Sequence, residues 1–240
     1  MEIIDINTCI GVRPEDDRPL DLATLQEQMA RAGVAYALCT HSAAIRFHSQ
    51  AGNAKMLQLA QDPHLYPVAV VNPAPYVGVT EEIALYARQG FKGLRFIPHQ
   101  QNWSLASEPF QRALEAAASF KLPCIVEVSS SGDATLVGLL AREVAIPVIL
   151  ANVTYATMGE AIAVLETCPN LYLELCRLVT PGIVELLAER LGDRRLLFGS
   201  GAPAWEIVPT LQMIQHADIS PGSKARLLGE NAQQTFHLGD

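Results

Sequence analysis

Eight short apolar segments alternate with segments of helical periodicity along the 240-residue chain. Such segments are typical of parallel strands that are buried on both faces, because helices cover the sheet. The expected strands are residues 2–11, 34–40, 65–72, 92–97, 123–129, 147–152, 171–176 and 195–200. Eight consecutive strand-then-helix units predict an α/β fold, a (β/α)8 TIM barrel whose first and last strands pair. Because no low-complexity linker interrupts the pattern, we expect residues 1–240 to form one domain.

The intervening segments carry apolar residues three and four positions apart, as in Leu22, Leu25 and Met29, which predicts helices. Helices are expected at about residues 20–33, 49–61, 79–89, 108–120, 134–144 and 158–167, from residue 181, and at 207–216 and 223–236. The Pro- and Asp-rich residues 12–19 are expected to form a loop, and a second loop is expected to begin at His41.

Charge and hydropathy argue against two kinds of partner. The net charge is −8, from 17 basic and 25 acidic residues, and no basic stripe is available to neutralise the phosphates of a nucleic acid. No apolar run approaches the roughly 20 residues that span a bilayer, and the chain begins with an acidic-flanked strand instead of a basic and then apolar leader. We therefore expect no nucleic acid, no membrane and a cytoplasmic location.

The five cysteines are odd in number and lack the C-x-x-C spacing of a zinc knuckle. Reduced thiols are therefore expected. Cys39, Cys124 and Cys168 lie in apolar surroundings, where free cysteine is commonly a small buried hydrophobic residue. Cys9 and Cys176 are different, because each stands at the end of an expected strand.

Polar residues collect at the ends of the expected strands, where TIM barrels carry their active sites. They are Asn7, Cys9, His41, Asn72, Arg95, His99, Glu127, Asn152, Glu174, Cys176 and Arg177. Side-chain alternation places Asp5, Arg95, Glu127 and Glu174 inside the barrel. Three acids against one arginine predict a raised carboxyl pKa, a bound cation or a cationic ligand. Glu127 is the residue that we expect to be protonated near neutral pH. The alternative is a purely structural role for these buried polar groups, in which Arg95 neutralises Asp5 or Glu127.

A series of short motifs resembles one known family over almost the whole chain. The motifs are Asp5 to Cys9, Gly90 to Phe96, Pro147 to Asn152, Pro169 to Glu174, Arg195 to Pro203 and Gly229 to Ala232. In this order they resemble the amidohydrolase-related (amidohydrolase 2) family of metal-dependent hydrolases and decarboxylases. The resemblance implies a TIM barrel with metal ligands on strands one, five, six and eight. Those positions hold Asn7, Cys9, Glu127, Asn152 and Gly201 here, so every usual ligand is replaced.

No metal cofactor is therefore expected. A weaker alternative is a zinc site in which His41 or His99 joins Cys9 and Glu127, since zinc binds thiolate, imidazole and carboxylate groups.

Two functions remain open from the sequence. The first is a hydrolase or decarboxylase of a small polar molecule, with Glu127 as general acid or base, Arg95 as an anion clamp and Cys9 as an alternative nucleophile. The second is a catalytically inactive barrel that binds a small ligand or a partner subunit. In both, the expected pocket in the barrel mouth includes Asp5, Asn7, His41, Asn72, His99, Asn152, Glu174, Cys176 and Gly201. A homo-oligomer is compatible with either function.

Overall fold

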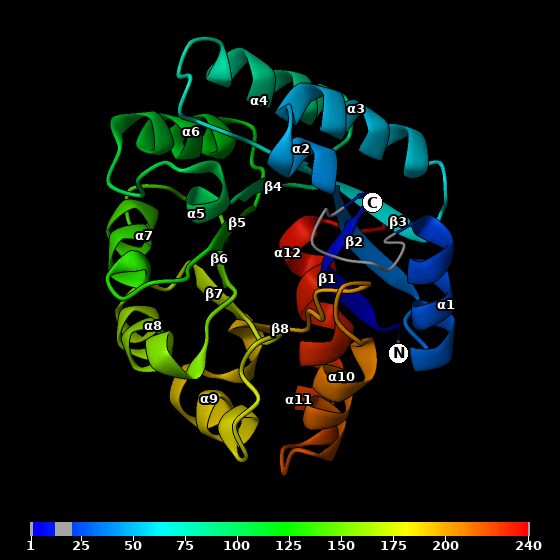
Figure 1. The fold of residues 1–240 in the computed structure, drawn as a ribbon. Coiled ribbons are helices and arrows are strands. Elements are labelled where there is room, and N and C mark those ends of the chain that lie inside the picture. Colours follow the sequence, from blue (N-terminus) through cyan, green and yellow to red (C-terminus); the bar gives the residue numbers. More distant parts are fainter. Residues whose placement is uncertain (1, 13–20, 240) are drawn as a thin grey trace.

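Eight parallel strands stand around a barrel in the order in which they occur in the sequence (Figure 1). The computed structural model describes residues 2–12 and 21–239. The strands are β1 (Ile4–Ile10), β2 (Tyr36–His41), β3 (Leu65–Val70), β4 (Gly93–Phe96), β5 (Cys124–Glu127), β6 (Val148–Ala151), β7 (Leu171–Glu174) and β8 (Leu196–Leu197). The (β/α)8 TIM barrel predicted from the sequence is confirmed.

The barrel closes between its first and last strands, as predicted. The amide of Ile6 donates to the carbonyl of Phe198 at 3.0 Å, and the amide of Gly201 donates to the carbonyl of Asn7 at 2.7 Å. A further bond joins the Cys9 amide to the Ala202 carbonyl at 2.9 Å. The regular part of β8 is only two residues long, so the segment that follows it completes the closure. This pairing sets Gly201 beside Asn7.

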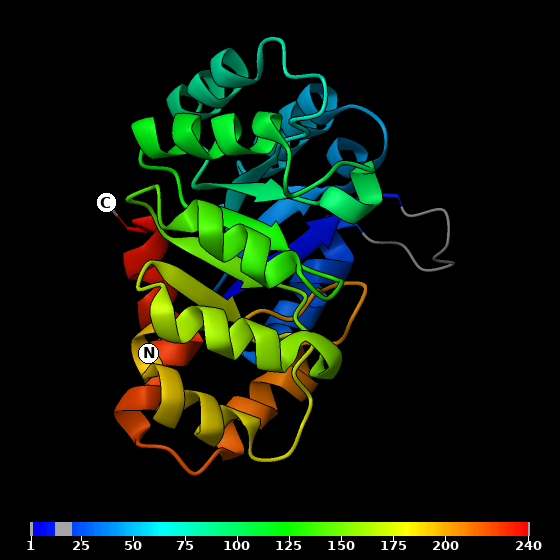
Figure 2. The same cartoon turned by 90° about the vertical axis from the view of Figure 1, so that its left-hand side faces the viewer.

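Helices surround the strands, as Figures 1 and 2 show. They are α1 (Leu22–Ala32), α2 (Ser42–Arg46), α3 (Ser49–Leu59), α4 (Val79–Arg88), α5 (Pro98–Gln101), α6 (Glu108–Ser119), α7 (Asp133–Ala141), α8 (Tyr155–Thr167), α9 (Ile183–Leu191), α10 (Ile207–His216), α11 (Pro221–Ala225) and α12 (Asn231–Phe236). A 3-10 turn covers Asp193–Arg195. Within the described residues, no helix is both long and apolar enough to cross a membrane.

The final helix closes the barrel at the end opposite the α5 side (Figure 2). Phe236 of α12 is buried in a cluster with Ile4, Ile6 and Ile125, whose side chains fill the barrel interior. A methyl group added at Gly93, the first residue of β4, would stand 3.0 Å from the Phe236 ring. Apolar packing therefore fills the amino-terminal end of the barrel and leaves the carboxyl-terminal end for polar groups.

Three helical features differ from the sequence predictions. The short helices α2 and α5 lie directly after β2 and β4, where loops were expected. The expected helix over residues 223–236 is interrupted by a π-helix at Arg226–Glu230. Gly229 lies in that turn, and a Cβ there would stand 2.1 Å from the Glu2 carbonyl oxygen, so β1 crowds the turn. The expected loop at 12–19 falls almost entirely outside the described residues, as does the expected start of the first helix at Leu20.

Candidate functional site

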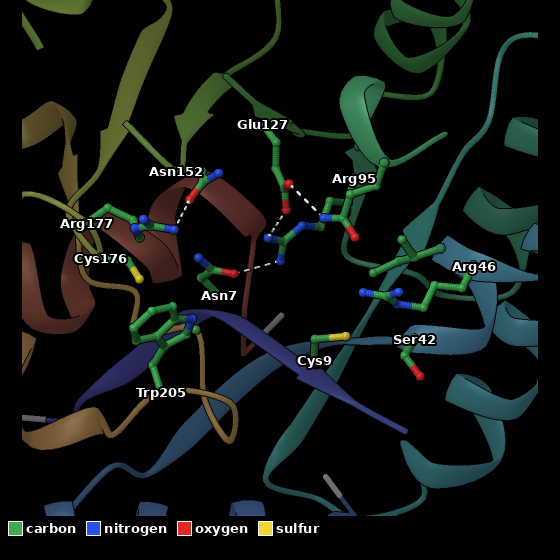
Figure 3. A pocket seen from close by; sticks show the side chains of 13 residues that line it. Asn7, Cys9, Ser42, Arg46, Arg95, Glu127, Asn152, Cys176, Arg177 and Trp205 are labelled. Carbon is green, nitrogen blue, oxygen red and sulfur yellow. Dashed lines mark hydrogen bonds and ion pairs between the residues drawn. The ribbon is translucent and has the colours of Figure 1, made fainter. Parts of the chain in front are cut away.

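A pocket of about 200 Å³ opens at the carboxyl ends of the strands (Figure 3). Its lining includes five residues from the sequence-predicted set in the barrel wall, namely Asn7, Cys9, Arg95, Glu127 and Asn152. Cys176, Arg177 and Gly201 line it as well, together with Ser42, Ile45, Arg46, Gln100 and Trp205. This is the end of a TIM barrel at which catalytic groups gather, because side chains from several strands converge there.

The centre of the pocket is an ion pair between Arg95 on β4 and Glu127 at the end of β5. Arg95 Nη2 lies 2.6 Å from Glu127 Oε1, and Nη1 donates to Asn7 Oδ1 at 2.7 Å (Figure 3). Both side chains are nearly buried, with 7% and 11% of their surface exposed. The other carboxylate oxygen, Oε2, accepts a longer bond of 3.4 Å from Gln100 Nε2 on α5. Arg95 Nε is buried and has no hydrogen-bond partner.

Arg177 brings a second guanidinium to the pocket. Its Nη1 donates to Asn152 Oδ1 at 3.2 Å, and its guanidinium carbon lies 5.3 Å from the centre of the Trp205 ring. A guanidinium over an indole ring gains cation–π attraction. Asn152 adopts φ of 65°, which Asn tolerates better than most residues, and its Nδ2 donates to Ser129 Oγ at 3.3 Å. Side-chain contacts thus hold Arg177 at the pocket.

Two acids expected in the pocket, Asp5 and Glu174, lie fully buried beneath it. Strand alternation puts Asp5 below Asn7, and its Oδ1 accepts from the amides of Asn7 and Ser200, both at 3.0 Å. Glu174 accepts from the Cys176 amide at 2.6 Å. Burial raises the pKa of Asp5 to about 6 and that of Glu174 to about 7, although these hydrogen bonds oppose the change. The predicted raised carboxyl pKa therefore falls on these two residues.

The charge of the pocket lining is opposite to the one expected. Arg46, Arg95 and Arg177 face one acid, Glu127, among the described lining residues. The sequence predicted a raised carboxyl pKa, a bound cation or a cationic ligand as alternatives, and the charge of the lining does not favour the last two in this pocket. Arg95 contacts the Glu127 carboxylate directly, which is one of the two pairings that the structural alternative allowed. An ion-paired carboxylate can accept a proton but has none to donate.

Three other predicted pocket residues lie outside its lining. His41 ends β2, where its Nδ1 accepts from the Ala43 amide at 3.1 Å and caps α2. His99 Nε2 lies 2.7 Å from Asp133 Oδ2. Asn72 lines a neighbouring cavity. His41 is the last residue of β2, His99 lies on α5 after β4, and Asn72 lies in the loop after β3, so all three stand near strand ends but outside the lining of the central pocket.

Sequence reasoning missed the pocket residues that follow the strands at a distance. Arg46 and Gln100 lie on the unpredicted helices α2 and α5. Trp205 is held by its amide, which donates to the Gly201 carbonyl at 3.2 Å. Position is the signal for Arg46 and Gln100, which lie within about five residues of the ends of β2 and β4, whereas Trp205 lies farther from the end of β8 and has no such signal.

The sequence profile of the amidohydrolase family matches residues 5–238, so the chain belongs to the amidohydrolase family. This confirms the resemblance seen in the sequence motifs. No curated protein sequence matches the chain.

Several solved structures share the barrel at low sequence identity. A probable 2-pyrone-4,6-dicarboxylic acid hydrolase from Acinetobacter baumannii, with citric acid bound, has a TM-score of 0.77 at 12% identity, covering 99% of this chain and 100% of its own. The 5-carboxyvanillate decarboxylase from Novosphingobium aromaticivorans, complexed with manganese, has a TM-score of 0.77 at 14% identity, and the match covers 99% of this chain and 96% of that one. The 2,6-dihydroxybenzoate decarboxylase from Rhizobium has a TM-score of 0.76 at 13% identity, and the match covers 100% of this chain and 99% of that one. At these identities the likeness concerns the fold.

The residues of this pocket do not fit the metal that the family resemblance implies. The carboxylate of Glu127 and the side-chain oxygen of Asn7 already accept hydrogen bonds from Arg95. Gly201 supplies no side chain. Within the described residues, no three His, Cys, Asp or Glu side chains are grouped as metal ligands. A divalent ion at Glu127 would also meet the positive charge of Arg95, which opposes its binding.

Proposed function

We propose that this amidohydrolase-family barrel binds a small organic carboxylate in the arginine-lined pocket and hydrolyses it, with Glu127 as the general base. The observation that carries the proposal is the Arg95–Glu127 pair at the pocket centre, with Nη2 and Oε1 2.6 Å apart. A buried base beside fixed positive charge is an arrangement suited to acyl-group chemistry, because proton removal and anion stabilisation occur at adjacent atoms.

In the proposed reaction Glu127 Oε2 accepts a proton from a water molecule. This oxygen is the one that Arg95 does not contact, and its 3.4 Å bond from Gln100 is long enough to yield to a water. The oxygen of that water forms a bond to the carbonyl carbon of the substrate, and the bond from this carbon to the leaving group then breaks. The proton on Glu127 passes to the leaving group, which restores the carboxylate.

The arginines have separate roles in this proposal. Arg95 holds Glu127 through Nη2 and supplies positive charge beside the bound substrate. Arg177, positioned by Asn152 and Trp205, binds the carboxylate of the substrate. Guanidinium groups suit both tasks because they stay charged and bind oxygen pairs with a fixed geometry. In this proposal the two arginines supply the positive charge that a metal ion supplies in metal-dependent hydrolases.

The names of the structural neighbours support a carboxylate substrate. One is a probable hydrolase of a dicarboxylic acid, and the others are decarboxylases of 5-carboxyvanillate and 2,6-dihydroxybenzoate. Decarboxylation is the second candidate reaction for this chain. It requires a proton donor to carbon, and the ion-paired Glu127 favours hydrolysis over it. The five cysteines form no disulfide within the described residues, which supports the cytoplasm as the proposed location.

Two alternative functions of the pocket predict different results in the experiments described below. Cys9 lines the pocket with Glu127 and Arg95, and a thiolate there would attack the substrate directly. A barrel that only binds its ligand is favoured by the replacement of all five family ligand positions. Both readings keep the arginine-lined pocket.

The test is incubation of the purified protein, after dialysis against a chelator, with carboxylates that carry an ester, lactone or amide bond. The three compounds named for the neighbours are included. Mass spectrometry distinguishes gain of water from loss of carbon dioxide. For an active compound, Glu127→Gln should lower turnover by about 10²–10⁴-fold, the usual contribution of a general base. Arg177→Gln should raise KM. Arg112→Gln is the surface control, because Arg112 is half exposed on α6.

Unchanged turnover in Glu127→Gln would refute the role of this residue. Loss of turnover in Cys9→Ser, with Glu127→Gln still active, would favour the thiol. Carboxylate binding by calorimetry, with no product from any compound, would favour the binding-only barrel.

A further inference from the structure

A second cavity, of about 490 Å³, adjoins the arginine-lined pocket. Ile45, Arg46 and Gln100 line both spaces, so the two cavities meet at α2 and α5. The second cavity, here called the outer groove, runs between α2 with the start of α3 and the loop that joins β3 to α4. Figure 1 places these elements together on one side of the barrel.

The side chains of the inner pocket are ordered along a line that leads to the outer groove. Arg177 and Arg46 stand on opposite sides of the pocket, with Glu127 and Arg95 between them (Figure 3). The proposed base, Glu127 Oε2, accepts from Gln100, which also lines the outer groove. A substrate whose carboxylate lies at Arg177 and whose carbonyl lies at Glu127 therefore has its leaving group on the side of the outer groove.

The size of the inner pocket supports this division of the substrate. Sites for small organic ligands usually have volumes of about 300–1,000 Å³. The inner pocket, at about 200 Å³, is smaller than this range, and the outer groove by itself falls within it. The inner pocket holds the acid end and the carbonyl group, and the outer groove is the space for the leaving group.

Three side chains present hydrogen-bond donors to the outer groove. Asn72 Oδ1 accepts from the backbone amide two residues later at 3.0 Å, which leaves the Nδ2 group for a ligand. Gln101 Oε1 accepts from Trp103 Nε1 at 3.2 Å, which leaves the Nε2 group. His48 Nδ1 accepts from a backbone amide of α3 at 3.4 Å, so the neutral ring carries its proton on Nε2.

Two other side chains present acceptors. Gln100 donates to Glu127 through Nε2, which leaves Oε1 as an acceptor. Glu82 accepts from the Tyr86 hydroxyl through Oε1 and has Oε2 as a further acceptor. Arg46 at the junction and Glu82 carry opposite charges. The outer groove therefore combines donors with acceptors, and neither sign of charge prevails in it.

Hydroxyl groups fit this lining, because each can donate one hydrogen bond and accept others. A second carboxylate offers acceptors only and would meet the charge of Glu82. An ammonium group offers donors only and would meet the charge of Arg46. An apolar group would cover the polar atoms without pairing them, which is unfavourable.

We infer that the outer groove is the leaving-group subsite for a hydroxyl-bearing alcohol, and that the substrate is a half-ester of this alcohol with a small dicarboxylic acid. The inference rests on the proposed function, and it names the class of substrate. Glu127 takes a proton from water, and the water oxygen bonds to the ester carbonyl carbon. The bond from that carbon to the alcohol oxygen breaks, and this oxygen takes the proton from Glu127. The products are the dicarboxylate and the free polyol.

Hydrolysis of three hydrogen succinate esters tests this inference. Their alcohols are methanol, glycerol (esterified at a terminal oxygen) and 2-methylbutanol, which replaces the two free hydroxyls of the glycerol ester by methyl groups. The corresponding malonate and glutarate half-esters repeat the test at other acid lengths. The kcat/KM of the glycerol ester should exceed that of either other ester by at least about tenfold, since two hydroxyl groups each gain hydrogen bonds in the groove.

Substitutions in the groove should remove this preference. Asn72→Leu and Gln101→Leu should each lower the ratio of kcat/KM for the glycerol ester to that for the methyl ester by about three- to tenfold, because each removes one donor. Gln212→Leu is the matched control, because Gln212 is exposed on α10 and lines neither cavity, and it should leave the ratio unchanged. Calorimetry with Glu127→Gln measures binding of the three esters without turnover.

Two results would overturn the subsite while leaving the proposed function intact. One is an equal kcat/KM for the three esters. The other is the same ratio in Asn72→Leu, Gln101→Leu and Gln212→Leu. If no ester is hydrolysed but the glycerol ester binds more tightly than the methyl ester, the subsite stands and the proposed hydrolysis fails. If no ester binds, both fail.

Discussion

Arg95 Nη2 lies 2.6 Å from Glu127 Oε1 at the centre of the barrel mouth, and the family resemblance implies a strand-five metal ligand at the position of Glu127. The same guanidinium binds Asn7, which occupies a strand-one ligand position. A second guanidinium, from Arg177, binds Asn152 at the strand-six position. Three of the five positions at which the family resemblance implies metal ligands thus bind arginine side chains. Two separate groups of contacts, one around Arg95 and one around Arg177, keep positive charge in the pocket.

Removing only one partner of the Arg95–Glu127 ion pair should destabilise the protein. Arg95→Met should lower the free energy of unfolding by about 3–5 kcal/mol, because it leaves the nearly buried Glu127 carboxylate without its partner. The double variant Arg95→Met, Glu127→Leu should recover part of that loss. Urea denaturation measures both. The exposed pair of Arg112 and Glu108 is the control, where Arg112→Met should cost less than about 1 kcal/mol. Additive effects of the two buried substitutions would contradict the pairing.

The barrel could be predicted from the sequence because each strand is a short apolar run followed by a helical one. That pattern repeats eight times and fixes the strand order. Alternation within strands also placed Asp5, Arg95, Glu127 and Glu174 inside the barrel, and all four are nearly or fully buried.

The sequence allowed Arg95 to pair with Asp5 or Glu127 but did not decide between these two acids. Alternation gives the face of a side chain but not its height in the barrel, so the sequence could not separate the buried Asp5 and Glu174 from Glu127 at the pocket. Arg95 reaches Glu127 from the neighbouring strand. Asp5 and Glu174 lie deeper, where burial raises their pKa. Arg46 and Gln100 depend on the short helices α2 and α5, which lack a periodic pattern long enough to detect.

Gly199 is required by the packing of Glu174. A Cβ at residue 199 would stand 2.4 Å from Glu174 Oε1 and 2.8 Å from Asn7 Cβ. Gly199→Ala should therefore destabilise the protein by about 1–3 kcal/mol or more and disturb Asn7. The control is Gly159→Ala in α8, where a Cβ has nothing within 4 Å and should stabilise by about 0.5–1 kcal/mol. Equal thermal unfolding midpoints for the two variants would contradict this account.

Restoring the family aspartate at residue 201 should not create a metal site. Gly201 has φ of +80°, and a Cβ there would stand 2.8 Å from Trp205 Cδ1. Gly201→Asp should therefore unfold at lower temperature than Gly182→Asp, which has a similar φ of +74° but nothing within 4 Å of its Cβ. Manganese titration should show no stoichiometric binding to either variant, since Arg95 keeps its charge at Glu127. Tight manganese binding by Gly201→Asp would show that the arginine does not block the site.

The fully buried Glu174 should make the stability of the barrel depend on pH. Burial raises its pKa from 4.5 to about 7. The folded state therefore binds this proton more tightly than the unfolded state, and the resulting stability is fully present below pH 4.5. It is lost as the pH rises through about 7, and a shift of this size corresponds to about 3 kcal/mol at most.

Glu174→Gln removes this dependence while its Oε1 still accepts from the Cys176 amide. The free energy of unfolding of Glu174→Gln should therefore rise relative to the wild type between pH 5 and pH 8, by up to about 3 kcal/mol. Asp5 titrates in both proteins, so its contribution cancels in the comparison apart from its charge interaction with Glu174. Glu108→Gln, at an exposed position on α6, is the control and should follow the wild type at both pH values. Parallel loss of stability in Glu174→Gln and the wild type would assign the pH dependence to Asp5 instead.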